Sequence, residues 1–145
     1  MMDLNLHSFK DQLKIKKEDG QVLLFDTIRK KYLVLQPEEL VRQLFIHFLL
    51  ENGYKKEKIQ VEKGFNQNGL FKRFDIVVYD EGFKPYMLIE CKSHHVKIDQ
   101  KTFDQISRYN MVLGAPFLVV TNGVQTHCLE IDAEGKIVAL ANFPV

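Results

Sequence analysis

A helix pattern that leads into a continuous apolar segment constrains the fold of this chain more than any other feature. The helix is predicted to begin after Asp99, which suits the N-cap position, and to end at Leu113 before Gly114. The apolar segment from Phe117 to Val120 follows, and such a run is typical of a strand that is covered on both faces. Strands, a crossover helix and then a buried strand predict an α/β domain with a mixed sheet.

Turn and helix-start residues divide the rest of the chain into further elements. Short strands are expected between Leu13 and Leu35, with a turn at Glu18-Asp19-Gly20. Pro37 suits the first position of a helix that is expected to run to about Glu51. The other predicted strands are Ile59–Phe65, Phe74–Tyr79, Tyr86–Lys92, Val124–Ile131 and a short strand after Gly135. The second and third of these are expected to form an antiparallel hairpin.

Charged side chains inside this hairpin are the first sign of chemistry, because a buried strand face should carry no charge without a partner. Glu90 and Lys92 share one face of their strand, since side chains alternate along it. If the loop is Glu81–Lys84, Asp75 lies directly opposite Glu90, with Cβ atoms about 4.5–5.5 Å apart. A register shift of one residue would separate the two acids. Carboxylates that lie so close repel unless a cation separates them, and oxygen ligands favour Mg²⁺ or Mn²⁺.

Lys92 completes a set that suits phosphodiester hydrolysis. An ammonium group beside an activated water can orient it or stabilise negative charge on a phosphate. In-line attack by a metal-activated water is the natural reaction of such a site. Each residue alone is better explained by a salt bridge at a strand end, whereas the ordered set of two acids and a lysine favours catalysis.

Asp75 followed by Glu90-Cys91-Lys92 resembles the PD-(D/E)xK nuclease signature, with Phe74 where the signature has proline. Over roughly Phe25 to Gly123 the chain resembles the N-terminal nuclease domain of type I restriction enzyme R subunits. The segments that carry this resemblance are Arg29-Lys30-Lys31-Tyr32, Pro37-Glu38-Glu39-Leu40-Val41-Arg42-Gln43, Phe74-Asp75-Ile76-Val77-Val78-Tyr79 and Leu88-Ile89-Glu90-Cys91-Lys92.

The resemblance implies a restriction-endonuclease-like fold, in which helices flank a mixed β-sheet, and a DNA substrate. Asp75, Glu90 and the backbone carbonyl of Cys91 are the expected ligands of Mg²⁺ or Mn²⁺, and Lys92 is expected to assist the attacking water. The expected organisation is a single domain, with strands and turns in residues 1–36, a catalytic core in 37–131 and a C-terminal strand in 132–145.

Gln105 and Tyr109 lie on one face of the second helix, because they are four residues apart. They resemble the Gln-x-x-x-Tyr element that follows the catalytic lysine in related nucleases, which implies that they approach the active site and contact DNA. Lys72, Arg73 and Arg108 are further candidates for DNA contacts. Two structural alternatives stand beside this hypothesis, namely a capping box that ends at Gln105 and a core position for Tyr109.

An acid from the first helix completes the site in many nucleases of this fold. Glu38 and Glu39 are the candidates, and Glu38 is favoured because it flanks the apolar stripe of the helix, whereas Glu39 faces away from its centre. The alternative for both is that they stabilise the helix dipole.

No nucleotide site is expected. Gly64 and Gly69 have the outer spacing of a phosphate-binding loop, but Leu70-Phe71 follows in place of the lysine and hydroxyl residue that such a loop needs. Any ATP-driven motor or specificity subunit would therefore be a separate chain, and cleavage of both strands would favour a homodimer.

The primary hypothesis is thus metal-dependent hydrolysis of DNA in a restriction or repair context, with RNA left open as a substrate. The alternative is an inactive domain of the same fold that binds nucleic acid or a protein partner, and the net charge of only +1 favours it slightly. The start of the chain lacks an apolar signal core and the two cysteines are isolated, so a cytoplasmic location without membrane contact is expected.

Overall fold

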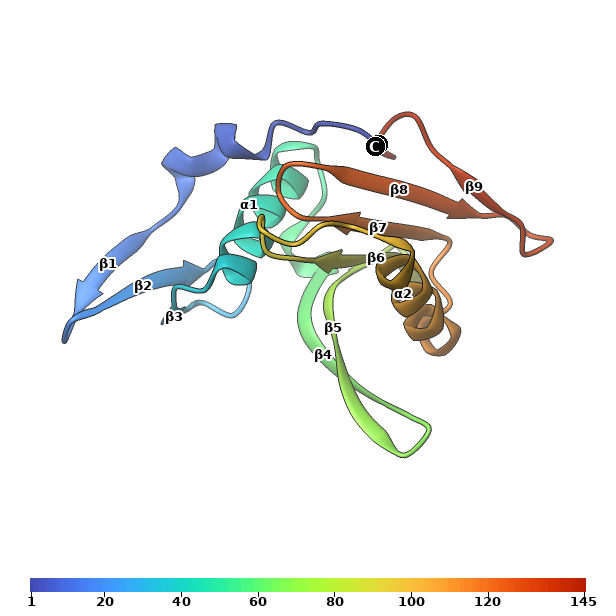
Figure 1. The fold of residues 1–145 in the computed structure, drawn as a ribbon, viewed down its shortest axis with the longest axis horizontal. Coiled ribbons are helices and arrows are strands. Elements are labelled where there is room, and N and C mark those ends of the chain that lie inside the picture. The colour runs from blue at the N-terminus through green and yellow to red at the C-terminus, as the bar shows by residue number, and fades with distance from the viewer.

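A six-stranded mixed sheet is the frame of the computed structural model, which describes residues 1–145 (Figure 1). Its strands lie side by side in chain order, and all neighbours are antiparallel except β6 and β7, which are parallel. The strands are β4 (Ile59–Gln67), β5 (Leu70–Tyr79), β6 (Pro85–Cys91), β7 (Phe117–Thr121), β8 (Thr126–Ile131) and β9 (Ile137–Ala139). The predicted α/β class and mixed sheet are therefore confirmed.

The crossover helix α2 (Gln100–Leu113) makes the parallel pairing possible, because it returns the chain to the end of the sheet at which β6 began. The carboxylate of Asp99 accepts a hydrogen bond from the backbone N–H of Thr102, and Gly114 takes a left-handed conformation with φ of 75°. Both helix ends thus lie where the sequence predicted them. Asp99 caps the helix by itself, so the alternative of a capping box that ends at Gln105 is wrong.

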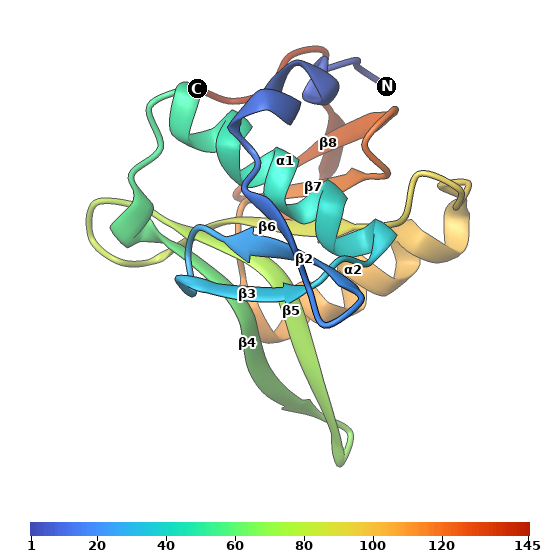
Figure 2. The ribbon, with the colours of Figure 1, turned by 90° about the vertical axis from the view of Figure 1, so that its left-hand side faces the viewer.

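The two faces of this sheet carry separate apolar cores. Helix α1 (Pro37–Glu51) packs on one face, where Phe45 and Ile89 are fully buried, and α2 covers the other, where Ile106 and Leu118 are fully buried (Figures 1 and 2). Each such side chain contributes about 1.5–3 kcal/mol of burial free energy. Neither of these helices, nor any other in the chain, is long and apolar enough to cross a membrane.

A second sheet of three antiparallel strands lies beside α1 and consists of β1 (Ile15–Glu18), β2 (Gln21–Asp26) and β3 (Lys31–Val34). Its first turn is the predicted one, since Asp19 and Gly20 both have positive φ. The sequence did not predict that these strands form a separate sheet. Short 3-10 helices precede it (Leu6–Gln12) and precede β4 (Lys56–Lys58).

Strands β4 and β5 form a hairpin that the sequence did not predict, and both are longer than expected. Its strands extend to Gln67 and Leu70, and they are joined by Asn68-Gly69, whose positive φ values suit a tight hairpin turn. Strand β5 pairs with β6 only from Ile76 onwards, so the outer part of the hairpin projects beyond the sheet (Figures 1 and 2).

Asp26 fixes the small sheet to the helix that follows it. Its carboxylate is fully buried, accepts hydrogen bonds from the backbone N–H groups of Ile28 and Arg29, and forms an ion pair with the Arg29 guanidinium. Arg29 in turn contacts Glu39 of α1 at 3.1 Å. Burial alone would raise the pKa of Asp26, but these contacts with Arg29 outweigh it and lower the pKa.

Asp26→Ala should lower the free energy of unfolding by about 3–5 kcal/mol at neutral pH, because it leaves buried donors and a cation without their acceptor. Because the pKa of Asp26 is lower in the folded state, its contribution is present above the unfolded pKa of about 3.8 and is lost as pH falls further. Urea unfolding measures both effects. Glu18→Gln breaks an exposed ion pair of the same sheet and should cost less than about 1 kcal/mol; equal losses in both variants would contradict this account of Asp26.

Candidate active site

Three acidic residues lie in a row across neighbouring strands, and we call Glu62, Asp75 and Glu90 the acid row. The pairs Val61–Ile76 and Lys63–Phe74 place Glu62 beside Asp75. The pair Ile76–Ile89, continued by one residue, places Asp75 opposite Glu90. This is the register that the sequence predicted, and the bulge between Val78 and Tyr79 lies on the turn side of it. The two strands thus bring together the two acids of the predicted site.

Asp75 is almost completely buried and uses both of its oxygens. One accepts a hydrogen bond from the backbone N–H of Cys91 at 2.8 Å, and the other accepts one from the Arg42 guanidinium at 3.2 Å. The carboxylate thus takes a backbone donor of β6 just beyond Ile76–Ile89, the last residue pair of the β5–β6 ladder. Burial raises the pKa of Asp75 to about 6, although the charge of Arg42 acts in the opposite direction.

Glu90 is equally buried but lacks such compensation. Its Oε1 lies 3.6 Å from the Nζ of Lys92, and its Oε2 is buried without any hydrogen-bond partner. Burial and then the charge of Asp75 raise the pKa of Glu90 to about 8. A carboxylate with one orphaned oxygen beside a second carboxylate is a place where an additional cation would be stabilised.

Lys92 links the acid row to helix α2. Its ammonium group donates to Oε1 of Gln105 at 3.3 Å, and the amide of Gln105 donates to the hydroxyl of Tyr109 at 2.9 Å. The ring of Tyr109 packs edge-on against Phe65 in the core on this face of the sheet. The structure therefore brings the predicted residues Glu90, Lys92, Gln105 and Tyr109 into one connected chain of contacts, and it also gives Tyr109 the core position of the structural alternative.

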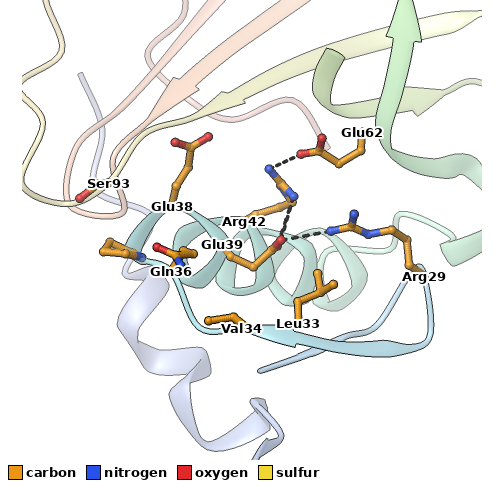
Figure 3. Close-up of a pocket in the computed structure, with 10 residues that line it drawn as sticks. Arg29, Leu33, Val34, Gln36, Glu38, Glu39, Arg42, Glu62 and Ser93 are labelled. Carbon is orange, nitrogen blue, oxygen red and sulfur yellow. Dashed lines mark hydrogen bonds and ion pairs between the residues drawn. The ribbon is translucent and has the colours of Figure 1, made fainter. Parts of the chain in front are cut away.

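The two acids at the start of α1 have different surroundings. Glu39 forms ion pairs with Arg29 and Arg42 and accepts a hydrogen bond from Gln43. Glu38 has no hydrogen bond or ion pair, and Figure 3 shows its carboxylate directed away from that of Glu39. The charge of Glu38 contributes to the raised pKa values of both Asp75 and Glu90. Of the two, Glu38 is the acid with free oxygens near the site.

A pocket of about 540 Å³ lies between β3, the start of α1, β4 and the segment after β6 (Figure 3). The charged and polar side chains that line it include Arg29, Glu38, Arg42, Glu62 and Ser93. Asp75, Glu90 and Lys92 do not line it, and Arg42 forms the boundary between the pocket and Asp75. The pocket therefore leads to the acid row from the side of α1.

Arg42 and Glu62 are the site residues that the sequence reasoning missed. The buried guanidinium of Arg42 contacts Glu39 at 3.0 Å, Glu62 at 2.6 Å and Asp75 at 3.2 Å. Burial by itself would lower the pKa of Arg42, but the charges of Asp75 and Glu39 outweigh it and raise the pKa. A signal was available for Arg42, because it is a charged residue inside the apolar stripe of its helix.

Glu62 carries no such signal. Its φ of 56° is a left-handed conformation that costs a non-glycine residue about 1–3 kcal/mol. In this conformation its carboxylate contacts Arg42 while the strand pairing continues on either side of it. The contact with Arg42 offsets the backbone strain.

The predicted DNA-contacting residues are distributed over two sides of the β4–β5 hairpin. Lys72 lies 5.6 Å from the centre of the Tyr109 ring, on the side that faces α2. Arg73 points to the other side and approaches Glu62 at 4.0 Å. Arg108 is exposed on α2, and its backbone carbonyl accepts a hydrogen bond from Gln67. The thiol of Cys91 is fully buried and burial raises its pKa, so it takes no part as a thiolate.

Comparison with known protein families matches residues 37–144 to the family described as type I restriction enzyme R protein N terminus (HSDR_N). The chain belongs to this family. It also resembles a solved fragment of an HsdR subunit of a type I restriction enzyme from Vibrio vulnificus YJ016, with 27% sequence identity and a TM-score of 0.49. That similarity covers 66% of this chain and 21% of the other, so the chain corresponds to about a fifth of its length. No curated protein matches the chain.

The acid row of this R-protein N-terminal region fits a divalent cation that prefers oxygen ligands. The orphaned Oε2 of Glu90 is buried beside Asp75, and burial together with the charge of Asp75 raises the pKa of Glu90 more than the charge of Lys92 lowers it. No group of three or more His, Cys, Asp or Glu side chains gathers into a metal cluster. Two carboxylates completed by backbone oxygen and water suit Mg²⁺, which usually keeps several waters.

Glu90→Gln should stabilise the metal-free protein at alkaline pH. The folded protein holds the Glu90 proton up to about pH 8, whereas the unfolded chain loses it near pH 4.5, so stability falls as pH rises through this window. The variant lacks this fall, so its stability relative to the wild type should rise through the window by about 1.4 kcal/mol for each pH unit. Thermal unfolding in EDTA across the pH range measures the difference; a gain that is independent of pH would contradict the assignment.

Arg42→Gln should lower the free energy of unfolding by about 3–5 kcal/mol in EDTA, because three carboxylates lose the guanidinium that they share. Arg73→Gln is the matched control, since its side chain is 61% exposed and only approaches Glu62. That control should cost less than about 1 kcal/mol. If urea unfolding gives similar small losses for both variants, Arg42 does not hold the acid row together.

Proposed function

We propose that this R-protein N-terminal region hydrolyses phosphodiester bonds of DNA with Mg²⁺ or Mn²⁺, as a nuclease of the PD-(D/E)xK type. The observation that carries the proposal is the buried pair of Asp75 and Glu90, with one orphaned carboxylate oxygen and Lys92 beside it. Membership of the R-protein family supports a restriction context.

Asp75 and Glu90, together with the backbone carbonyl of Cys91, would hold the cation. When bound, the cation would polarise a phosphate oxygen and lower the pKa of a water molecule. Asp75 would have to share or release the hydrogen bond from Arg42, and Arg42 would keep Glu39 and Glu62 as partners. Arg42 would thus still neutralise Glu62 while Asp75 and Glu90 bind the metal.

Lys92 would orient the attacking water and stabilise negative charge on the phosphate. Its ammonium group is held between Glu90 and Gln105, and Tyr109 fixes Gln105 in turn. This three-residue support leaves Lys92 little freedom, which favours a defined geometry of attack. Glu38 would assist from the α1 side, because its free carboxylate lies near enough to affect the pKa of both acids.

The partners of the proposed nuclease follow from its family context. DNA would be the substrate, and a motor or specificity component of the restriction enzyme would deliver it. Cleavage of both strands would need two copies of the site, either in a homodimer or recruited separately. A second candidate function is DNA binding without cleavage, and the position of Arg42 on Asp75 favours it, because a guanidinium already occupies one oxygen that a metal would need.

Purified chain should cleave DNA in Mg²⁺ or Mn²⁺ but not in EDTA, and Asp75→Ala or Lys92→Ala should reduce the rate by about 10²–10⁴-fold. Supercoiled plasmid, linear duplex and single-stranded DNA identify the preferred substrate. Lys101→Ala, which removes an exposed lysine at the start of α2, should cleave as fast as the wild type.

Metal binding is measured in parallel as the shift of the melting temperature in Mg²⁺ or Mn²⁺. The wild type and Lys101→Ala should be stabilised, and Asp75→Ala should not. Equal cleavage by all variants would indicate a contaminant and overturn the assignment. Absence of cleavage and of any metal shift, with DNA still bound, would favour the binding function.

A further inference from the structure

The outer part of the β4–β5 hairpin, residues 63–73, is a two-stranded ribbon that we call the arm. Its residues pair only with one another, because β5 meets β6 only from Ile76 onwards. Figures 1 and 2 show the arm extending beyond the rest of the sheet. Its base lies at Glu62 and Asp75, so it begins at the acid row. Whatever the arm contacts therefore lies next to the candidate active site.

The composition of the arm is that of a surface for a polyanion. It carries Lys63, Lys72 and Arg73 and no acidic residue. Amide side chains gather at its tip, at positions 66–68. Leu70 and Phe71 are 60% and 62% exposed, although both are large apolar residues. Nothing else in the fold covers these two side chains, which indicates that the arm is built for contact with a partner.

One side of the arm is anchored to α2. The ring of Phe65 packs against Tyr109, with 5.2 Å between ring centres, and Gln67 donates a hydrogen bond to the backbone carbonyl of Arg108 at 2.7 Å. Phe65 and Phe74 also stack on each other at 4.0 Å. These contacts hold the ribbon in one orientation relative to the site, so the arm is positioned before any partner arrives.

The other side of the arm presents an aromatic ring and a guanidinium. The far end of the Phe71 ring lies against Gly64, where an added Cβ would come within 2.6 Å of the ring. The Arg73 guanidinium lies 5.3 Å from the centre of the same ring and approaches Glu62 at 4.0 Å. Glu62 lines the pocket beside α1, so this pair faces the same side as that pocket.

We propose that the arm enters a groove of duplex DNA and thereby places the adjacent backbone at the acid row; this inference rests on the proposed nuclease function. A two-stranded ribbon fits the major groove, which is about 12 Å wide. Lys63, Lys72 and Arg73 contact phosphates, Asn66 and Asn68 reach base edges, and Phe71 packs against the bases or sugars.

A second copy of the chain is a poorer partner for the arm. In a two-fold interface the same surface meets itself, so the cations of one arm would face those of the other without an acidic residue to pair with them. DNA offers the complementary charge along the length of the ribbon. The arm is therefore assigned to the substrate and not to an oligomer interface.

The test is binding of the full chain to a labelled duplex in EDTA, where no cleavage occurs, measured by fluorescence anisotropy. Phe71→Ala should weaken binding about tenfold, on the scale of one lost groove contact. Arg73→Gln should weaken DNA binding several-fold. It should also reduce the magnitude of the slope of log K, where K is the association constant, against log salt concentration by about 1. Phe83→Ala and Lys84→Gln are matched controls, because an aromatic residue and a lysine are both exposed in the turn after β5, at the end opposite the arm, and both variants should bind as the wild type does.

A second measurement locates the arm directly. The chain contains no tryptophan, so Phe71→Trp and Phe83→Trp each introduce a single fluorescent reporter. Duplex DNA should quench and shift the emission of the Phe71→Trp variant and leave that of Phe83→Trp unchanged. Wild-type affinity in both arm variants, or equal responses of the two reporters, would overturn the inference even if Asp75→Ala abolishes cleavage. Sedimentation that changes with Phe71→Ala while DNA affinity does not would assign the arm to self-association instead.

Discussion

The contact of one buried guanidinium with three carboxylates holds the centre of this fold together. Arg42 on α1 reaches Glu39 on its own helix, Glu62 on β4 and Asp75 on β5. Without it, the buried Asp75 would have no counter-charge, a state that costs several kcal/mol, and Glu62 would keep only the longer contact with Arg73. Through Glu39 and Arg29 the same network continues to Asp26, so it also joins the small sheet to the large one. The contacts of Arg42 therefore fix the position of α1 over the sheet and also balance the negative charges of the site.

That network stops short of Glu90, and the chemistry of the site follows from this asymmetry. Asp75 has a cation and a backbone donor, whereas Glu90 has one orphaned oxygen and a single ion pair, with Lys92 at 3.6 Å. The orphaned acid lies between the half of the site that is structurally satisfied and the half formed by Lys92 and Gln105. The site therefore has positive charge from Arg42 at Asp75 and a deficit of positive charge at Glu90. The proposed metal occupies this deficit, and the arm proposed to contact DNA begins at the same row of residues.

The sequence by itself determined the local elements and the register that matters most. Pro37, Asp99 and Gly114 set helix ends through capping and backbone preferences that act within a few residues, so they could be read directly from the chain. The register of β5 and β6 was predicted on the condition that their loop is Glu81–Lys84. The chain instead pairs Tyr79 with Pro85, and a bulge between Val78 and Tyr79 restores the predicted register, which continues to Asp75 opposite Glu90. The spacing of Gln105 and Tyr109 placed them on one helix face, and there the amide of Gln105 donates a hydrogen bond to the hydroxyl of Tyr109.

Only the tertiary structure decided which charges meet across the chain. Arg42 and Asp75 belong to different elements, and no local preference indicates that they touch or that Glu62 takes a left-handed conformation to join them. The choice between Glu38 and Glu39 depended on Arg29, which comes from the small sheet and occupies Glu39. The separation of that sheet and the length of the arm were likewise not evident from the sequence, because polar residues in an exposed ribbon lack the apolar alternation that marks a strand. Local geometry is determined by neighbouring residues and can be predicted from the sequence, whereas charge pairing depends on how whole helices and strands pack.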